Sequence, residues 1–151
     1  MEVGGKTEAI TIRAADAGDY DDLMAVWIAS GSEISPRGRD SRDAFVAHVE
    51  QFPGLSFVAL SANWIVGVVL GSHDGRKGWI NRLAVLPGHR RRGIAEQLVT
   101  ACDAALRAAG IEVVAALVEA DNPASAGLFR KLGYSDEIQV YYFRKLSRPD
   151  A

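Results

Sequence analysis

The sequence predicts an α+β fold in which about four helices flank a central, twisted mixed sheet that is mostly antiparallel. Three consecutive strand patterns joined by turn signals lie between residues 55 and 86, and the most regular amphipathic helix of the chain follows them. An uninterrupted apolar run comes after that helix. A strand, a helix and a second strand in this order form a right-handed crossover, so the fourth and fifth strands should be parallel.

The chain before this region predicts one strand and two helices. Residues 10–13 alternate apolar and polar side chains, and a helical spacing of apolar residues begins at Tyr20 and stops near Gly31. Residues 31–40 are rich in serine, proline, glycine and charge, which predicts a loop. Helical spacing returns over residues 41–51.

The central strands are predicted by β-branched and aromatic composition. Residues 55–59 and 64–70 flank a short polar bend and therefore predict a hairpin. A further turn leads to a strand over residues 78–86, which Pro87 ends because proline cannot donate to the ladder.

The second half of the chain supplies the crossover. Apolar residues at steps of three or four predict a helix that ends at Gly110: Ile94, Leu98, Cys102, Ala105, Leu106 and Ala109. Residues 113–118 predict a strand buried on both faces. A last helix capped by Asn122 follows, and residues 134–146 predict a hairpin-like segment.

The composition fits one domain over residues 9–147, with a flexible segment at 1–8 and a short tail at 148–151. The net charge of -2 gives no general attraction to nucleic acid or to an anionic membrane. Cys102 is the single cysteine, which predicts a reducing cytoplasm, and no histidine has a second ligand at metal spacing. We therefore expect a soluble cytoplasmic protein without a metal.

The segment between the fourth strand and the next helix predicts an anion site. Its residues are Pro87-Gly88-His89-Arg90-Arg91-Arg92-Gly93-Ile94-Ala95. The first amides of a helix lack internal partners and carry partial positive charge, so a pyrophosphate can accept several hydrogen bonds there. The alternative is a solvated charge run, but cations at a helix N-terminus oppose the dipole unless an anion is present.

The residues Arg90-Arg91-Arg92-Gly93-Ile94-Ala95 match the signature [QR]-x-x-G-x-[GA], and the whole region resembles the GNAT N-acetyltransferase superfamily. Before the signature, residues 80–87 are similar to the fourth strand of that family. After it, residues 118–122 and 127–134 are similar to the fifth strand and the following helix. The resemblance implies a GNAT-like fold and acetyl-CoA as co-substrate.

The resemblance also implies roles for individual residues. The stretch Leu83-Ala84-Val85 would bind the pantetheine arm through the main chain of Leu83 and Val85, and Arg90 to Ala95 would hold the pyrophosphate. Asn122 and Phe129 would flank the thiol, although Asn122 is also a helix cap. Many family members place a catalytic tyrosine where this chain has Phe129.

The family's common base position falls on or near residues 79–81, where no side chain can titrate near neutrality, so the usual pair of acid and base is not visible. Glu119 is the candidate base, acting directly or through water, and Tyr134 is the candidate acid, with a packing role as its alternative. Alternation along a last strand would point Tyr141 or Tyr142 toward the groove.

The resemblance implies transfer of an acetyl group to a primary amine of a small molecule, or of a peptide or protein, by direct attack in a ternary complex. A non-catalytic acyl-CoA-binding module is the alternative, because the tyrosine is absent. A nucleic-acid binder using the three arginines is disfavoured by the net charge. Strands near the C-terminus could pair with a second copy to form a homodimer.

Overall fold

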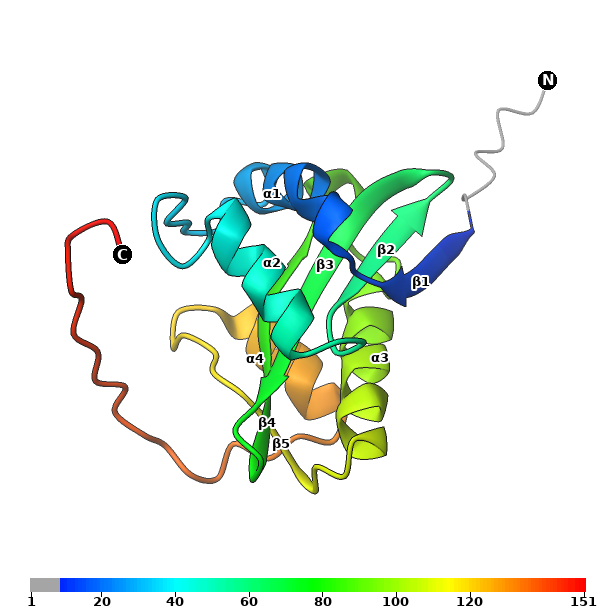
Figure 1. Cartoon of the computed structure of the whole chain (residues 1–151). Coiled ribbons are helices and arrows are strands. Elements are labelled where there is room, and N and C mark those ends of the chain that lie inside the picture. Colours follow the sequence, from blue (N-terminus) through cyan, green and yellow to red (C-terminus); the bar gives the residue numbers. More distant parts are fainter. Residues whose placement is uncertain (1–8) are drawn as a thin grey trace.

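The computed structural model describes residues 9–151, so the predicted flexible segment at 1–8 lies outside the described residues. In this part of the chain, five strands form one sheet in the order β1 to β5 (Figure 1). They are β1 (Ile10–Ala14), β2 (Phe57–Ser61), β3 (Trp64–His73), β4 (Lys77–Val85) and β5 (Val113–Ala116). The first three pairings are antiparallel and β4 pairs with β5 in parallel, which confirms the predicted fold class.

The described residues also form four α-helices, which cover both faces of the sheet. They are α1 (Tyr20–Ala29), α2 (Arg42–Gln51), α3 (Ile94–Ala108) and α4 (Pro123–Lys131). Side chains of β2 alternate between two cores: Val58 packs with Trp27 of α1 and Phe45 of α2, whereas Ala59 packs with Leu98 of α3 and Phe129 of α4. This alternation follows from the period of two along a strand.

Two predictions about the end of the sheet are wrong. Residues 135–146 contain no strand, so the predicted hairpin-like segment is an exposed coil, and Tyr141 and Tyr142 lie in no strand. The fifth strand is also not buried on both faces, because β5 lies at the edge of the sheet and Val113 is 51% exposed. One face of the segment is nevertheless packed, because Val114, Ala116 and Val118 contact the core cluster that includes residues of α3.

Among the described residues, no helix is long and apolar enough to cross a bilayer. They likewise contain no group of three or more His, Cys, Asp or Glu side chains placed to hold a metal ion.

Gly71 of β3 packs closely against two other parts of the chain, the backbone at Leu55 before β2 and the side chain of Cys102 in α3. A Cβ atom at this position would lie 2.2 Å from the carbonyl oxygen of Leu55 and 2.7 Å from Sγ of Cys102. We expect Gly71→Ala to lower the free energy of unfolding by about 1–3 kcal/mol or more, since the backbone oxygen cannot move without disturbing β2. Urea unfolding would measure this change.

Gly127 provides the matched control, because it lies in α4 and a Cβ there meets nothing within 4 Å. Gly127→Ala should raise the free energy of unfolding by about 0.5–1 kcal/mol, as alanine restricts the unfolded chain and favours a helix. Equal effects at the two glycines would contradict the close contact at Gly71.

His48 of α2 reaches the same strand, with Nε2 2.9 Å from the carbonyl oxygen of Gly71. Burial lowers the pKa of His48 below its ordinary 6.5, although the backbone hydrogen bond opposes the shift. The unfolded state therefore binds the proton more readily than the folded state. We expect stability to be at its full value above pH 6.5 and to fall as the pH drops below it.

The measurement is urea unfolding on both sides of that pH, with His48→Gln as the comparison. The variant keeps a donor toward Gly71 but cannot take up a proton, so its stability should change less across the same interval. An identical slope in both proteins would assign the effect to other groups.

Candidate functional site

The parallel pairing of β4 and β5 stops partway along β4. The last paired residues are Ile80 of β4 and Ala116 of β5, whereas β4 continues to Val85. Leu83, Ala84 and Val85 therefore have no partner on the β5 side among the described residues. Their main-chain groups border the opening between the two strands, where the resemblance places the pantetheine arm.

A β-bulge in β4 lies next to this opening. Leu70 of β3 pairs with Asn81 and Val68 pairs with Ala84, so Val69 alone faces Arg82 and Leu83. Arg82 has a φ of 57°, which a residue with a side chain rarely adopts. A bulge bends its strand and increases the local twist, and this bulge begins just after Ile80, the last residue of β4 that pairs with β5.

The opening leads to the first turn of α3. The chain leaves β4 through the short helix η2 (Pro87–His89) and enters α3 with Gly93 at φ 74° and no side-chain cap. The first helical hydrogen bond runs from the amide of Gln97 to the carbonyl of Gly93, at 3.0 Å. Among the described residues, none accepts a hydrogen bond from the amides of 91–96. These amides are available to an anion.

Three arginines directly precede Gly93. Arg90, Arg91 and Arg92 are all exposed, and Arg90 Nη2 lies 3.5 Å from the carbonyl oxygen of Ser30 at the end of α1. Within the described part of the chain, Arg91 and Arg92 form no salt bridge with a carboxylate. Free amides, a glycine without a Cβ and unpaired guanidinium groups fit the pyrophosphate of coenzyme A.

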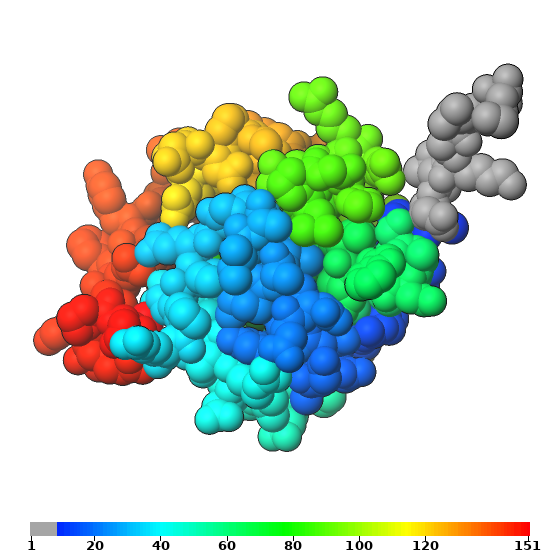
Figure 2. Space-filling view, turned by 90° about the horizontal axis from the view of Figure 1, so that it is seen from above, coloured from blue at the N-terminus to red at the C-terminus, as the bar shows by residue number. Residues whose placement is uncertain are grey.

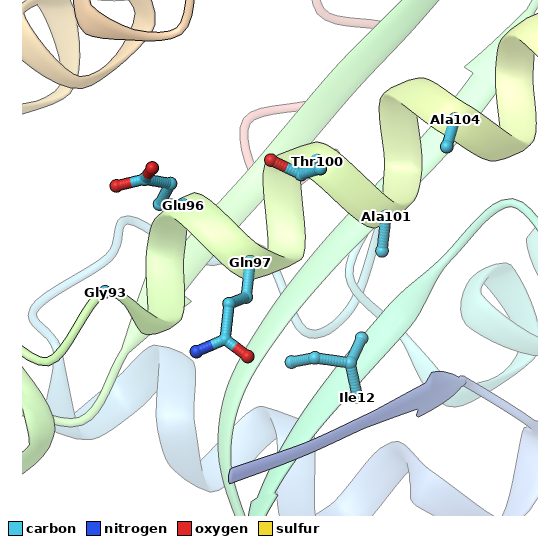
Figure 3. Close-up of a pocket in the computed structure, with 7 residues that line it drawn as sticks. All are labelled: Ile12, Gly93, Glu96, Gln97, Thr100, Ala101 and Ala104. Carbon is cyan, nitrogen blue, oxygen red and sulfur yellow. The ribbon is translucent and has the colours of Figure 1, made fainter.

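A separate hollow of about 620 Å³ runs along α3 on the side of β1 (Figure 3). Gln97, Thr100 and Ala104 line it from α3, and Ile12 lines it from β1. It meets the anion site at Gly93 and Glu96. The hollow is therefore distinct from the strand opening, which lies at the opposite edge of the sheet.

The residues predicted beside the thiol lie on α4. Asn122 caps this helix, since its Oδ1 accepts a hydrogen bond from the amide of Ser125 at 3.2 Å. Phe129 is 9% exposed and packs edge-to-face against Tyr134, with the ring centroids 5.1 Å apart. Asn122 therefore serves as the N-cap of α4.

The two candidate proton-transfer residues differ in their surroundings. The hydroxyl of Tyr134 donates a hydrogen bond to Asp103 of α3, and burial together with this contact raises the pKa of Tyr134. Its proton is therefore held against a carboxylate that also pairs with Arg107. Glu119 is exposed in the turn after β5, and its carbonyl accepts from the amide of Asn122.

A polar cluster that was not predicted from the sequence lies at the bulge. The guanidinium of Arg82 lies 4.6 Å from the centre of the Trp27 ring, and Nη1 donates to the carbonyl of Glu33 at 2.8 Å. Nη2 lies 3.3 Å from Oδ1 of the buried Asp40, and burial lowers the pKa of Arg82. The cluster ties the loop after α1 to β4. An arginine inside an otherwise apolar strand pattern was the available signal.

Comparison with known proteins gives a consistent result. Residues 21–134 match the family model described as the acetyltransferase (GNAT) family. An acetyltransferase from Yersinia enterocolitica is 27% identical over 135 residues, which cover 89% of this chain and 94% of the relative. An acetyltransferase from Sodalis glossinidius is 28% identical over 134 residues, which cover 89% of this chain and 93% of the relative.

Solved structures share the fold. The aminoglycoside N-acetyltransferase AAC(6')-Iy, in complex with a bisubstrate analog of CoA and acetylneamine, has a TM-score of 0.75 at 20% identity and covers 91% of this chain and 99% of its own. The PaiA N-acetyltransferase of Thermoplasma acidophilum, in complex with coenzyme A, has a TM-score of 0.75 at 17% identity, covering 84% and 90%.

The family match extends over most of the chain. It includes β4, α4 and the start of α3 with its free amides. The chain therefore belongs to the GNAT acetyltransferase family and is an acyltransferase that uses acetyl-CoA as its co-substrate.

Proposed function

We propose that this enzyme acetylates a primary amine of a small hydrophilic molecule, by direct attack of the amine within a ternary complex. The observation that carries the proposal is the strand opening beside Leu83–Val85, continuous in sequence with the unpaired amides of α3. Acetyl-CoA supplies the thioester, and the opening gives the acceptor a path to it. Alignment of two reactants in this way can supply about 7–11 kcal/mol of the barrier reduction.

The proposal assigns the binding residues as follows. The amides from Arg91 to Ala95, with the three arginines, hold the pyrophosphate, and the main chain of Leu83 and Val85 binds the pantetheine arm. Asn122 and Phe129 flank the thiol from α4. The residues assigned to the pyrophosphate lie at the start of α3, and those assigned to the pantetheine arm lie on the part of β4 that does not pair with β5. The roles of Asn122 and Phe129 are assigned from the resemblance to the family alone.

Proton transfer in this proposal depends on few groups. Glu119 accepts the proton of the acceptor amine, directly or through water, because it is the first exposed carboxylate after β5. Tyr134 is assigned a packing role, since its hydroxyl is already bonded to Asp103. The thiolate then leaves without a dedicated acid, so the expected catalysis is weak to moderate.

The acceptor is proposed to be a cationic amine of the aminoglycoside kind. Two of the similar structures are described as complexes of aminoglycoside acetyltransferases with acetylneamine or sisomicin. In this chain, the exposed carboxylates of Glu33, Glu119 and Asp121 lie on the loop after α1 and after β5. Such charges would attract a cation. The cytoplasm is proposed as the compartment because the single cysteine is a free thiol.

Thiol release from acetyl-CoA tests this proposal with a panel of aminoglycosides, small polyamines and peptides. The enzyme should give no background, because Cys102 is buried and burial raises its pKa to about 12. Turnover with aminoglycosides or polyamines is expected. Turnover confined to peptides would show that the acceptor is a peptide or protein amino group. Binding of acetyl-CoA without turnover of any amine would favour the non-catalytic acyl-CoA-binding module.

Phe129→Tyr tests the missing acid. A hydroxyl at this position should raise kcat by about 100-fold while the KM for acetyl-CoA stays constant, since about 10²-fold is the lower end of what general acid catalysis contributes. Phe129→Leu is the control, which removes the ring without adding a proton donor. An unchanged kcat with Phe129→Tyr would show that leaving-group protonation does not limit turnover.

A further inference from the structure

The peptide group that joins Arg82 to Leu83 is held by a side chain from another element. Nε1 of Trp27 in α1 donates a hydrogen bond to the carbonyl oxygen of Arg82, with 3.1 Å between the two atoms. Trp27 is only 1% exposed and belongs to the core cluster that α1 and α2 form with the sheet. Close packing fixes the indole ring, so the hydrogen bond links the β-bulge of β4 to a rigid partner.

The same indole ring also contacts the side chain of Arg82. The guanidinium lies over the ring, with its central carbon 4.6 Å from the ring centroid. Its two terminal nitrogens reach the carbonyl oxygen of Glu33 and the carboxylate of Asp40. Trp27 therefore holds Arg82 through the main chain and through the side chain at once.

These contacts keep Arg82 in an unfavourable backbone conformation. Its φ of 57° lies in the left-handed region, which a residue with a Cβ atom adopts only where its surroundings impose it. Such conformations are concentrated at functional sites. A regular strand would avoid this conformation, so its presence points to a role for the peptide group that follows Arg82.

That peptide group carries the amide of Leu83. The bond between Arg82 and Leu83 is trans, so the N–H of Leu83 points away from the carbonyl oxygen that Trp27 holds. Because a peptide group is planar, it rotates as one unit. Fixing the carbonyl oxygen therefore also fixes the direction in which the amide of Leu83 can donate.

The helix that carries Trp27 contacts the anion site as well as the bulge. Nη2 of Arg90 lies 3.5 Å from the carbonyl oxygen of Ser30, the C-cap residue of α1. Figure 2 shows the two segments side by side, with α1 in blue and the segment before α3 in light green. One helix thus borders both regions that are assigned to coenzyme A.

We propose that Trp27 is a positioning residue for acetyl-CoA, which keeps the amide of Leu83 directed at the pantetheine arm by holding the carbonyl oxygen of Arg82. The inference rests on the proposed assignment of the Leu83 main chain to that arm. The alternative is that Trp27 only fills the core. Removal of its N–H would then lower stability and affect all parts of the cofactor equally.

Calorimetry with two ligands separates these roles. Coenzyme A has a diphosphate and a pantetheine arm, whereas its nucleotide part, 3′-phospho-ADP, has the diphosphate alone. Trp27→Phe keeps a ring but removes the donor, so it should raise the Kd for coenzyme A by about 3- to 10-fold, the usual net effect of one hydrogen bond. The Kd for 3′-phospho-ADP should stay within about twofold, since the amides of α3 still bind the diphosphate.

Phe45→Leu is the matched control, because it truncates a ring of the same core cluster. It should leave the Kd for both ligands unchanged, although it lowers stability. An equal rise of the Kd for coenzyme A and for 3′-phospho-ADP in Trp27→Phe would assign Trp27 to core packing alone and overturn the inference.

Two substitutions of Arg82 test the backbone conformation while Trp27 stays in place. Arg82→Gly and Arg82→Val both lose the guanidinium and its contact with Asp40, so that loss is shared. Glycine adopts a positive φ readily, whereas a β-branched residue does not. Arg82→Val should therefore weaken binding of coenzyme A more than Arg82→Gly does, with the same Kd for 3′-phospho-ADP in both. Equal Kd values for coenzyme A would contradict the role of the bulge.

Nuclear magnetic resonance observes the amide of Leu83 directly. In the wild type its resonance should shift on addition of coenzyme A but not of 3′-phospho-ADP, and the shift should be at least halved in Trp27→Phe. A full shift in Trp27→Phe, with an unchanged Kd for coenzyme A, would overturn the inference and leave the assignment of Leu83 intact. A wild-type amide that does not respond to coenzyme A would overturn both. None of these measurements depends on the acceptor.

Discussion

Replacing Arg91 and Arg92 by alanine is expected to raise the Kd for acetyl-CoA by about 100-fold or more. Each charge-assisted contact with a phosphate is worth about 1.5–3 kcal/mol, so the loss of two contacts removes roughly 3 kcal/mol or more of binding free energy. Both guanidinium groups are exposed, and within the described residues neither pairs with a carboxylate, so no internal contact is lost. Isothermal titration calorimetry would measure the change.

The same double substitution that weakens acetyl-CoA binding should stabilise the ligand-free protein. Cations at the N-terminus of α3 oppose its dipole, so the same variant should be more stable without ligand by about 0.3–1 kcal/mol per arginine. Arg76→Ala is the control, since Arg76 is exposed in the turn before β4 and far along the chain from α3. An affinity for acetyl-CoA that falls equally in the control would contradict specific binding by Arg91 and Arg92.

Local sequence patterns predicted most of the helices and strands, because the spacing of apolar residues in each segment fitted only one type of secondary structure. The spacing from Ile94 to Ala109 matches α3, and the strand patterns at 64–70 and 78–86 differ from β3 and β4 by a few residues at their ends. The strand, helix and strand order fixed the parallel pairing of β4 and β5 through the handedness of crossovers. These are consequences of near-neighbour chemistry.

Features that depend on distant contacts could not be predicted in this way. The apolar run at 113–118 correctly predicted a strand but wrongly predicted its burial on both faces, because burial depends on which distant residues pack against β5. The residue with positive φ at the β-bulge is Arg82, whereas a sequence pattern would have assigned that conformation to a glycine or an asparagine. The free amides of α3 were predicted from the local motif, whereas the contact between Tyr134 and Asp103 joins residues far apart in sequence.

The cluster at the bulge gives the second large expected effect. Asp40→Asn should lower the free energy of unfolding by about 2–3 kcal/mol, because it removes the charge opposite a partly buried guanidinium. Asp40 has a side chain only 6% exposed, while that of Arg82 is 26% exposed, so solvent screening reduces the usual cost of breaking a buried pair. Nη2 and Nε of Arg82 have no hydrogen-bond partner within the described residues, so little else compensates.

The exposed pair of Arg42 and Asp21 is the matched control, with side chains 56% and 78% exposed. Asp21→Asn should change stability by less than about 1 kcal/mol. In the double variant Asp40→Asn with Arg82→Met, the losses should be less than additive, since the unpaired charge is then gone. Additive losses would show that Asp40 acts through its other contact, the hydrogen bond from the amide of Ser35 at 2.8 Å, and that the ion pair contributes nothing to holding the loop against β4.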